Sequence, residues 1–245
     1  MTLVYADNNA TTRVDAAVVE AMLPFLSERY GNPSSIHAFG SEVGRVVERA
    51  REQVAACLGA GQSSEILFTS CGTESNNTAI RSALASRKGR RRVITTRVEH
   101  PAVLTVARHL EREGYQVTYL PVDGRGRLDL NELEAALDEN VALVSIMTAN
   151  NETGVIFPVE QIGAMCRDRG VLFHTDAVQA IGKVSVDLAA GQVDLLSISG
   201  HKIHAPKGIG ALYIRRGIRF RPFLLGGHQE RGRRGGTENV PGIVA

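Results

Sequence analysis

The sequence contains few of the residues that mark several classes of protein. It has no tryptophan and only three cysteines, Cys57, Cys71 and Cys166, which form no C-x-x-C pair and no metal-ligand spacing. A sparse, odd set of cysteines excludes a disulfide-stapled miniprotein and indicates a reducing compartment, so we expect a cytoplasmic protein without a bound metal. The N-terminus lacks the apolar stretch of a signal peptide. No run approaches the ~20 apolar residues that a membrane span requires, so we expect no membrane contact.

An excess of charge of one sign is also absent. The 245 residues include 28 Lys and Arg against 26 Asp and Glu, a formal net charge of +2. A nucleic-acid-binding protein normally shows a clear basic excess, so we expect no nucleic-acid partner. The basic run at residues 87–92 is interpreted as a solvated turn between a helix and a strand. With 43% hydrophobic and 22% charged residues, the composition is that of an ordinary globular protein.

Short apolar runs alternate with helical patterns from about residue 64 onward. Strands are expected at 65–68, 92–95, 115–120, 141–147, 171–177 and 194–199, and helices at 74–86, 102–113, 130–137 and 159–170. The run 141–147 is almost wholly apolar, which is typical of a strand covered on both faces. This alternation predicts an α/β domain with a mostly parallel sheet.

The flanking segments differ from this pattern. Residues 30–44 are rich in loop-forming residues, and a long helix is expected over about 41–58. The stretch from residue 215 onward is rich in Gly and Arg with little periodicity, and a new helix pattern begins near residue 239. Cys57 and Cys166 fall within helical patterns and are expected to be core residues.

Ligands of doubly wound sheets bind at the loops that follow the carboxyl ends of strands. One such loop leads into a helix at Gly72 and Thr73, where free N–H groups and a hydroxyl would make a phosphate site. Taken alone, this pattern favours a simple helix cap by Thr73. A second loop carries His100, which could stack on a planar ligand or move protons, although a hydrogen-bonded surface histidine is the simpler interpretation.

Two further strand ends carry a carboxylate and a lysine. Asp176 follows an apolar run, so its charge should be buried and paired with a cation such as a protonated pyridine nitrogen; a role in capping the next turn is equally compatible. Lys202 follows the next strand in a glycine-flanked turn. A Schiff-base lysine, an acid and a phosphate cradle are what pyridoxal phosphate (PLP) chemistry requires. A zinc site at His201 and His204 is a weaker reading, because no further ligand lies near them in the sequence.

Long ordered strings give this pattern a family resemblance. The strings SGHKIHAPKGIGALY and HTDAVQAIGK, together with DNNATTRVD, YGNPSSIHAFG, EILFTSCGTESN, VEHPAVL, ANNETG and GGHQERGRRGGTEN, resemble cysteine desulfurases of the NifS/IscS type, nearest the nitrogen-fixation NifS branch. These are class V, fold-type-I PLP enzymes. The resemblance implies a three-layer α/β large domain with a mostly parallel central sheet over residues 16–245. It also implies an N-terminal segment, 1–15, that packs with a C-terminal small domain missing from this chain, and whose DNNATT stretch lies beside the cofactor as well.

The resemblance also implies roles for individual residues. Lys202 matches the lysine bonded to PLP, and Asp176 the acid on the ring nitrogen. His100 matches the histidine that stacks on the ring and assists proton transfer. The remaining cofactor contacts are Asn151 and Gln179 near the phenolic oxygen, Gly72, Thr73, Ser199 and His201 around the phosphate, and Thr237 reaching the phosphate of the partner subunit in a homodimer.

The implied reaction converts L-cysteine to L-alanine and passes the sulfur, as an enzyme persulfide, to an acceptor such as an iron–sulfur scaffold protein. The persulfide cysteine and the arginine that binds the substrate carboxylate are expected beyond Ala245, because none of the three cysteines matches the family position. We therefore expect a fragment that is inactive in sulfur transfer by itself. Two alternatives remain: another fold-type-I enzyme, such as a selenocysteine lyase or an aminotransferase, and a non-catalytic module of a sulfur-transfer assembly.

Overall fold

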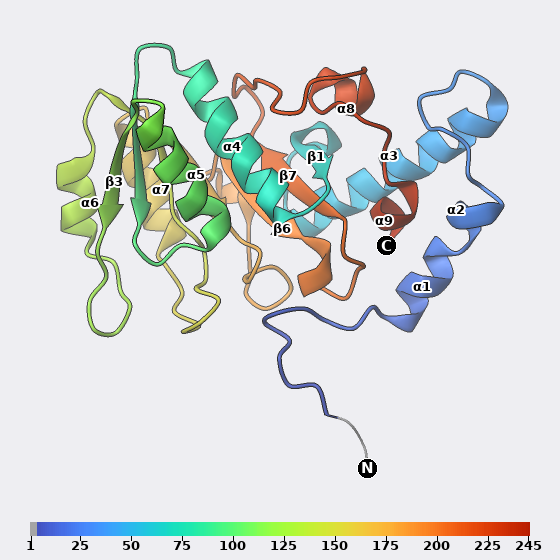
Figure 1. Ribbon diagram of the computed structural model, residues 1–245, viewed down its shortest axis with the longest axis horizontal. Helices are drawn as coiled ribbons and strands as arrows, with labels where there is room; N and C mark the ends of the chain where they lie inside the picture. The colour runs from blue at the N-terminus through green and yellow to red at the C-terminus, as the bar shows by residue number, and fades with distance from the viewer. Residues whose placement is uncertain (1–3) are drawn as a thin grey trace.

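One seven-stranded sheet organises the chain in the computed structural model, which describes residues 4–245 (Figure 1). The strand order is β1-β7-β6-β5-β4-β2-β3. The strands are β1 (Ile66–Thr69), β2 (Arg92–Thr96), β3 (Gln116–Leu120), β4 (Val141–Ser145), β5 (Leu172–Asp176), β6 (Leu195–Ser199) and β7 (Gly210–Ile214). Strands β2 to β6 pair in parallel, whereas β7 lies antiparallel between β1 and β6. The expected mostly parallel sheet is confirmed; the antiparallel β7 has no counterpart in the sequence prediction.

Helices connect and flank these strands. They are α1 (Ala16–Met22), α2 (Pro24–Ser27), α3 (Ala38–Leu58), α4 (Gly72–Ser86), α5 (Pro101–Arg112), α6 (Leu130–Ala136), α7 (Val159–Asp168), α8 (Gln229–Gly232) and α9 (Val240–Val244), with 3-10 turns η1 (Ser63–Glu65), η2 (Leu188–Ala190) and η3 (Gly200–Lys202). Helix α9 packs against α1, α2 and α3. Within residues 4–245, no helix combines the length and the apolar character that crossing a membrane requires.

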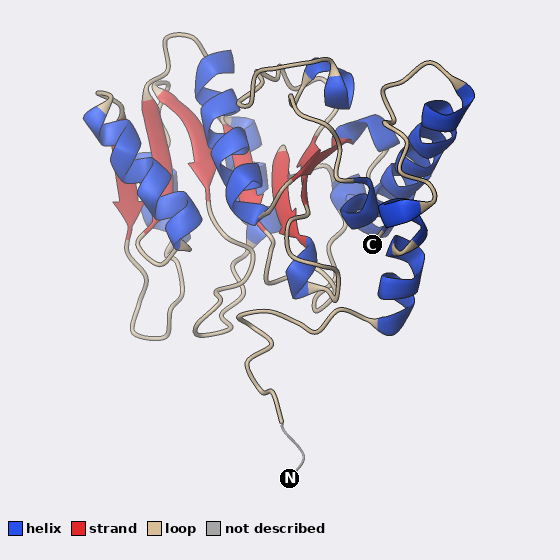
Figure 2. Ribbon diagram, turned by 45° about the vertical axis from the view of Figure 1, so that its right-hand side comes forward, coloured by secondary structure: helices blue, strands red, loops and turns tan. Residues whose placement is uncertain are grey.

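The sheet separates two hydrophobic cores, because successive residues of a strand point to opposite faces. Leu67 of β1 lies in the core formed with Ile80 of α4 and Leu110 of α5. Its neighbour Ile66 lies in the other core, with Ile162 of α7. Figure 2 shows helices on both sides of the strands. The molecule therefore has the expected three layers, helix, sheet and helix.

Two expectations for the flanking region are wrong. The long helix expected over about 41–58 is present as α3, but it begins at Ala38, so residues 38–40 are helical rather than part of the loop-rich segment. Cys57 is exposed and is not a core residue. The buried stripe of α3 includes Ala55, and Cys57 lies about 200° further around the helix, on the face away from the core. Cys166 is buried, as expected.

The N-terminal segment lies along the edge of the sheet where the parallel strands end. The backbone N–H of Thr12 donates to the carbonyl of His201 at 2.9 Å, and that of Asp15 donates to the carbonyl of His204 at 3.0 Å. Figure 1 shows this segment passing beside the turn that follows β6. Residues 1–3 of the expected segment 1–15 lie outside the described residues, and its packing against a further domain stays a prediction.

Candidate active site

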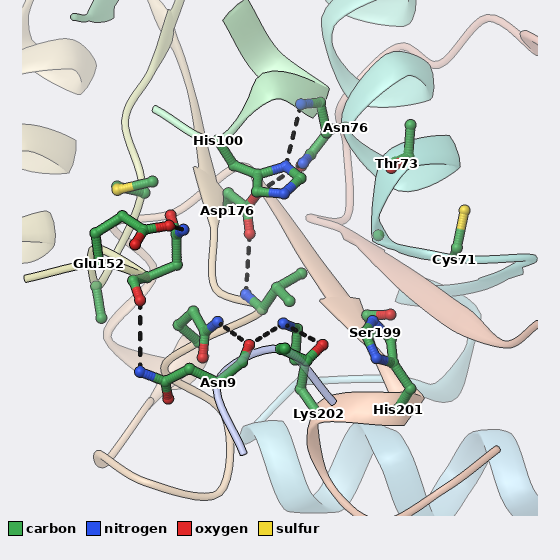
Figure 3. A pocket seen from close by; sticks show the side chains of 18 of the residues that line it. Asn9, Cys71, Thr73, Asn76, His100, Glu152, Asp176, Ser199, His201 and Lys202 are labelled. Carbon is green, nitrogen blue, oxygen red and sulfur yellow. Dashed lines mark hydrogen bonds between the residues drawn. The ribbon is translucent and has the colours of Figure 1, made fainter. Parts of the chain in front are cut away.

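A cavity of about 500 Å³ opens at the carboxyl ends of the parallel strands, between these ends, the first turn of α4 and the N-terminal segment (Figure 3). Every predicted site residue except Thr237 lines it: Gly72, Thr73, His100, Asn151, Asp176, Gln179, Ser199, His201 and Lys202. These residues come from segments far apart in the sequence. The parallel topology brings them together, because it places the ends of β2, β4, β5 and β6 on one edge.

Asp176 provides the buried negative group of the cavity. It is the last residue of β5, and its side chain is only 6% exposed. One carboxylate oxygen accepts a hydrogen bond from Asn76 Nδ2 at 2.6 Å, and the other accepts from the backbone N–H of Val178 at 3.0 Å. Burial raises the pKa of Asp176, although these bonds and the positive charge of Lys202 oppose the rise. The carboxylate thus caps the next turn, as one sequence interpretation expects, and it also lines the cavity. Its pairing with a bound cation stays a prediction.

Lys202 provides the amine, in the 3-10 turn that follows β6 directly. Its Nζ donates to the carbonyls of Asn9 and Ala10, the latter at 2.9 Å (Figure 3). Burial and the nearby charge of Lys183 lower the pKa of Lys202. A lysine with a lowered pKa holds a larger neutral fraction near neutral pH, which a nucleophile or a base requires.

His100 lines the cavity from the N-terminus of α5. Its Nδ1 accepts a hydrogen bond from the backbone N–H of Ala102 at 3.1 Å, so the residue caps this helix. Because Nδ1 is the acceptor, a neutral ring carries its proton on Nε2. The simpler interpretation, a hydrogen-bonded surface histidine, is therefore correct, and it coexists with a place in the cavity wall.

The first turn of α4 forms an anion cradle. The cap residue of this helix is Cys71, whose side chain makes no capping hydrogen bond, so the interpretation of Thr73 as the cap is wrong. A side chain at Gly72 would lie 2.9 Å from Val178 Cγ2 and 3.4 Å from Ser199 Cβ, so the close approach of these segments requires glycine. Ser199 is 3% exposed, and its buried Oγ has no partner among residues 4–245. Free helix N–H groups beside an unpaired hydroxyl suit an anionic ligand.

The N-terminal segment closes one side of the cavity. The carbonyl of Asn9, which also receives the Lys202 bond, accepts from Gln179 Nε2 at 2.9 Å, and Asn9 Nδ2 reaches the carbonyl of Asn151 at 3.4 Å. His201 Nδ1 lies 3.1 Å from Thr11 Oγ1. Burial lowers the pKa of His201, and the positive charges of Lys202 and Lys207 lower it further.

Some residues of the site were missed from the sequence. Asn76, on the buried face of α4, holds Asp176 and was not among the predicted residues. Asp7, Asn9 and Ala10 line the cavity, and they belong to the DNNATT stretch that the resemblance places beside the cofactor. No signal in the sequence singles out Asn76, because the buried face of α4 also carries the polar residues Ser75, Thr78 and Ser82. Glu99, next to His100, was also missed; its carboxylate accepts from the backbone N–H of Met147 at 3.0 Å, and burial raises its pKa to about 8.

Thr237 lies away from this cavity and is exposed. It belongs to the arginine-rich segment 226–239, which includes α8. Contact of Thr237 with the cofactor of a partner subunit stays a prediction.

Comparison with known proteins gives consistent matches. The sequence profile of the family "Aminotransferase class-V" matches residues 4–245. A cysteine desulfurase of Trichormus azollae is 64% identical over 244 residues, which cover 100% of this chain and 61% of that protein. The cysteine desulfurase NifS of Azotobacter vinelandii is 59% identical over 98% of this chain and 60% of its own length. The solved structure of a NifS-like protein is 50% identical and superposes with a TM-score of 0.96, over 99% of this chain and 67% of that one. The chain thus spans about 61% of the length of such relatives.

Proposed function

The chain belongs to the class-V aminotransferase family, whose members use PLP, and from this premise we propose that the protein is a PLP-dependent cysteine desulfurase of the NifS type. Its reaction would take sulfur from L-cysteine and leave L-alanine. The observation that carries the proposal is the placement of Lys202 and the buried Asp176 in the wall of one cavity. The names of the similar proteins, two cysteine desulfurases and a NifS-like protein, support the choice of reaction within the family.

The side chains of the cavity fit PLP. Desolvation destabilises the buried carboxylate of Asp176, and a protonated pyridine nitrogen is a cation that would stabilise it. The unpaired Oγ of Ser199 and the free N–H groups of Gly72 and Thr73 would hold the phosphate. Lys202 would provide the amine for the covalent bond to the cofactor. When bound, PLP supplies an aldehyde for that amine and a ring that withdraws electrons from the Cα of the substrate.

The residues of this chain would move and hold protons. Lys202, with its lowered pKa, is the base that would take the Cα proton of L-cysteine. His100 presents a second titratable group in the same cavity wall, and its Nε2 is available because Nδ1 is engaged by Ala102. Asp176 stays fixed by Asn76 and Val178, so that its carboxylate does not turn away from the cavity.

The cysteines of this chain argue against sulfur acceptance by the residues described. Cys57 is exposed on α3, and Cys166 is a buried residue of α7. Cys71 lines the cavity at the N-cap position of α4, the helix that forms the anion cradle, although its side chain makes no capping hydrogen bond. We therefore assign cofactor binding and proton transfer to the residues of the cavity wall. We do not assign the attack on sulfur to any of the three cysteines. We further propose a cytoplasmic homodimer in which Thr237 reaches the partner's cofactor, with an iron–sulfur scaffold protein as sulfur acceptor.

Reductive labelling tests the cofactor assignment. The chain is mixed with PLP, reduced with borohydride and digested, and the pyridoxyl label is located by mass spectrometry. We expect the label on Lys202 and its loss in Lys202→Ala, whereas Lys207→Ala, at an exposed lysine of the same loop, keeps it. A wild-type chain without label, or with the label on another lysine, contradicts the proposal and favours a non-catalytic module.

Proton exchange tests the substrate and the base. In heavy water with PLP, the wild-type chain is expected to exchange the Cα proton of L-cysteine for deuterium. The loss of the Cα proton signal is measured by proton NMR. Lys202→Ala should lose this exchange because, among the described residues 4–245, no other amine lines the cavity to take the proton. Equal exchange by both proteins would show that Lys202 is not the base.

A further inference from the structure

The first turn of α4 carries a carboxylate directly beside the anion cradle. Glu74 follows Gly72 and Thr73, the two residues of this turn that line the cavity, and its side chain is only 8% exposed. An acidic residue in the first turn stabilises a helix by itself. A phosphate on the same turn would carry close to two negative charges, so an uncompensated carboxylate there would repel it.

Arg234 compensates this charge. Its Nε donates to one carboxylate oxygen of Glu74 at 2.9 Å, and its Nη2 donates to the other carboxylate oxygen at 3.1 Å. The same carboxylate accepts from the backbone N–H of Ser70 at 2.8 Å. Burial acts to raise the pKa of Glu74, but the bonds from Arg234 and Ser70 hold it below its ordinary value. The bond to Glu74 raises the pKa of Arg234, so both groups are charged in this bidentate pair.

The segment that carries Arg234 is fixed by contacts that do not involve Glu74. The carboxylate of Glu230 forms a buried ion pair with Arg51 at 2.7 Å. The backbone N–H of Gly235 donates to the carbonyl of Leu224 at 3.0 Å. A Cβ at Gly235 would lie 2.7 Å from the backbone of Gly226. The two segments of this loop therefore touch at a point where both residues are glycine. Removal of the Arg234 charge should therefore leave the segment in place.

We propose that Arg234 is a positioning residue of the phosphate site, whose guanidinium cancels the charge of Glu74 so that the first turn of α4 can accept a phosphate dianion. The unpaired, buried Oγ of Ser199, which lies beside Gly72, independently marks this place as a ligand site. The inference rests on the proposed function insofar as the phosphate is that of PLP. It gives Arg234, one arginine of the segment 226–239, a role at the phosphate site of its own chain.

Two variants separate the charge from the structure. In Arg234→Gln, the affinity for PLP, measured by absorbance titration, is expected to fall about tenfold, equivalent to ~1.4 kcal/mol. The affinity for pyridoxal, which lacks the phosphate, should stay unchanged. The double variant Glu74→Gln/Arg234→Gln should recover the PLP affinity because neither charge remains. Arg231→Gln is the matched control, since Arg231 lies on the same segment but pairs with Glu48 of α3.

Other outcomes overturn the inference. If Arg234→Gln binds PLP as wild type does, or loses pyridoxal and PLP equally, the pair does not act through the phosphate. A double variant as weak as Arg234→Gln would assign the pair a structural role. If Arg234→Gln fails to fold, the single variant Glu74→Gln decides. We expect it to bind PLP at least as tightly as wild type, and a clear loss of PLP affinity would contradict the inference. If wild type binds no PLP, the proposed function fails, and inorganic phosphate binding to wild type and Glu74→Gln still tests the inference.

Discussion

The ion pair between Arg51 and Glu230 is expected to contribute strongly to stability. The side chains are 6% and 2% exposed, and two hydrogen bonds of 2.7 Å join them. Glu230 also accepts from the backbone N–H of Phe68 at 3.0 Å. Burial acts to lower the pKa of Arg51, but its bonds to Glu230 and Glu48 raise it, so the guanidinium stays charged in the interior.

Glu230→Gln would leave that guanidinium buried with weaker partners. Removal of one member of a buried pair costs about 3–5 kcal/mol. We expect a value near ~3 kcal/mol, the lower end of that range, because Glu48 still contacts Arg51 at 3.1 Å. Glu230 and the following Arg231 also have positive φ angles of 49° and 60°, an unfavourable backbone that the ion pair holds in place. A loss of this size is large against a typical stability of about 5–15 kcal/mol.

Urea denaturation followed by circular dichroism measures this loss. The matched control is Glu42→Gln, which breaks the pair with Arg29 on the surface, where the side chains are 38% and 52% exposed. That change should cost less than ~1 kcal/mol. The double variant Arg51→Met/Glu230→Met should regain part of the loss, because it leaves no unpaired buried charge. If Glu230→Gln and Glu42→Gln destabilise equally, the argument from burial is refuted.

Two further predictions concern the surroundings of the cavity. Burial raises the pKa of Glu99 from 4.5 to about 8. Its contribution to stability is therefore complete below pH 4.5 and is lost as the pH rises through about 8. Glu99→Gln should flatten the fall in urea midpoint between pH 4.5 and about pH 8, and an unchanged slope would contradict the assignment. Gly72→Ala should weaken PLP binding and lower the free energy of unfolding by about 1–3 kcal/mol, because its Cβ would lie 2.9 Å from Val178 Cγ2. The control Gly124→Ala, where a Cβ meets nothing within 4 Å, should change neither quantity. Equal effects at both glycines would refute the steric argument.

The residues that follow strands could be located from the sequence alone. Asp176 and Lys202 each end or follow a run of strand-forming residues, and in a parallel sheet such positions must meet at one edge. The lysine, the carboxylate and the N-terminus of α4 were therefore recognisable before any coordinates. Their detailed roles toward PLP came from the resemblance of long motifs to one family, and not from periodicity.

The residues that support this site could not be located in that way. Asn76 reaches Asp176 across 100 residues of sequence, because α4 crosses the sheet with this side chain facing the end of β5. The same limit applies to Glu74 and Arg234, which pair across 160 residues. No local pattern encodes such a contact, since both partners are ordinary polar residues within their own segments.

The order of strands and helices, the strand-end groups and the family resemblance were thus contained in the sequence, because each depends on local spacing or on motifs. Three features depended on the tertiary structure. The antiparallel insertion of β7 beside β6, the N-terminal segment across the cavity and the ion pairs that hold residues 226–239 all join distant parts of the chain. The physical reason is that buried polar groups need hydrogen-bond partners in the folded interior, and these partners can come from any part of the chain.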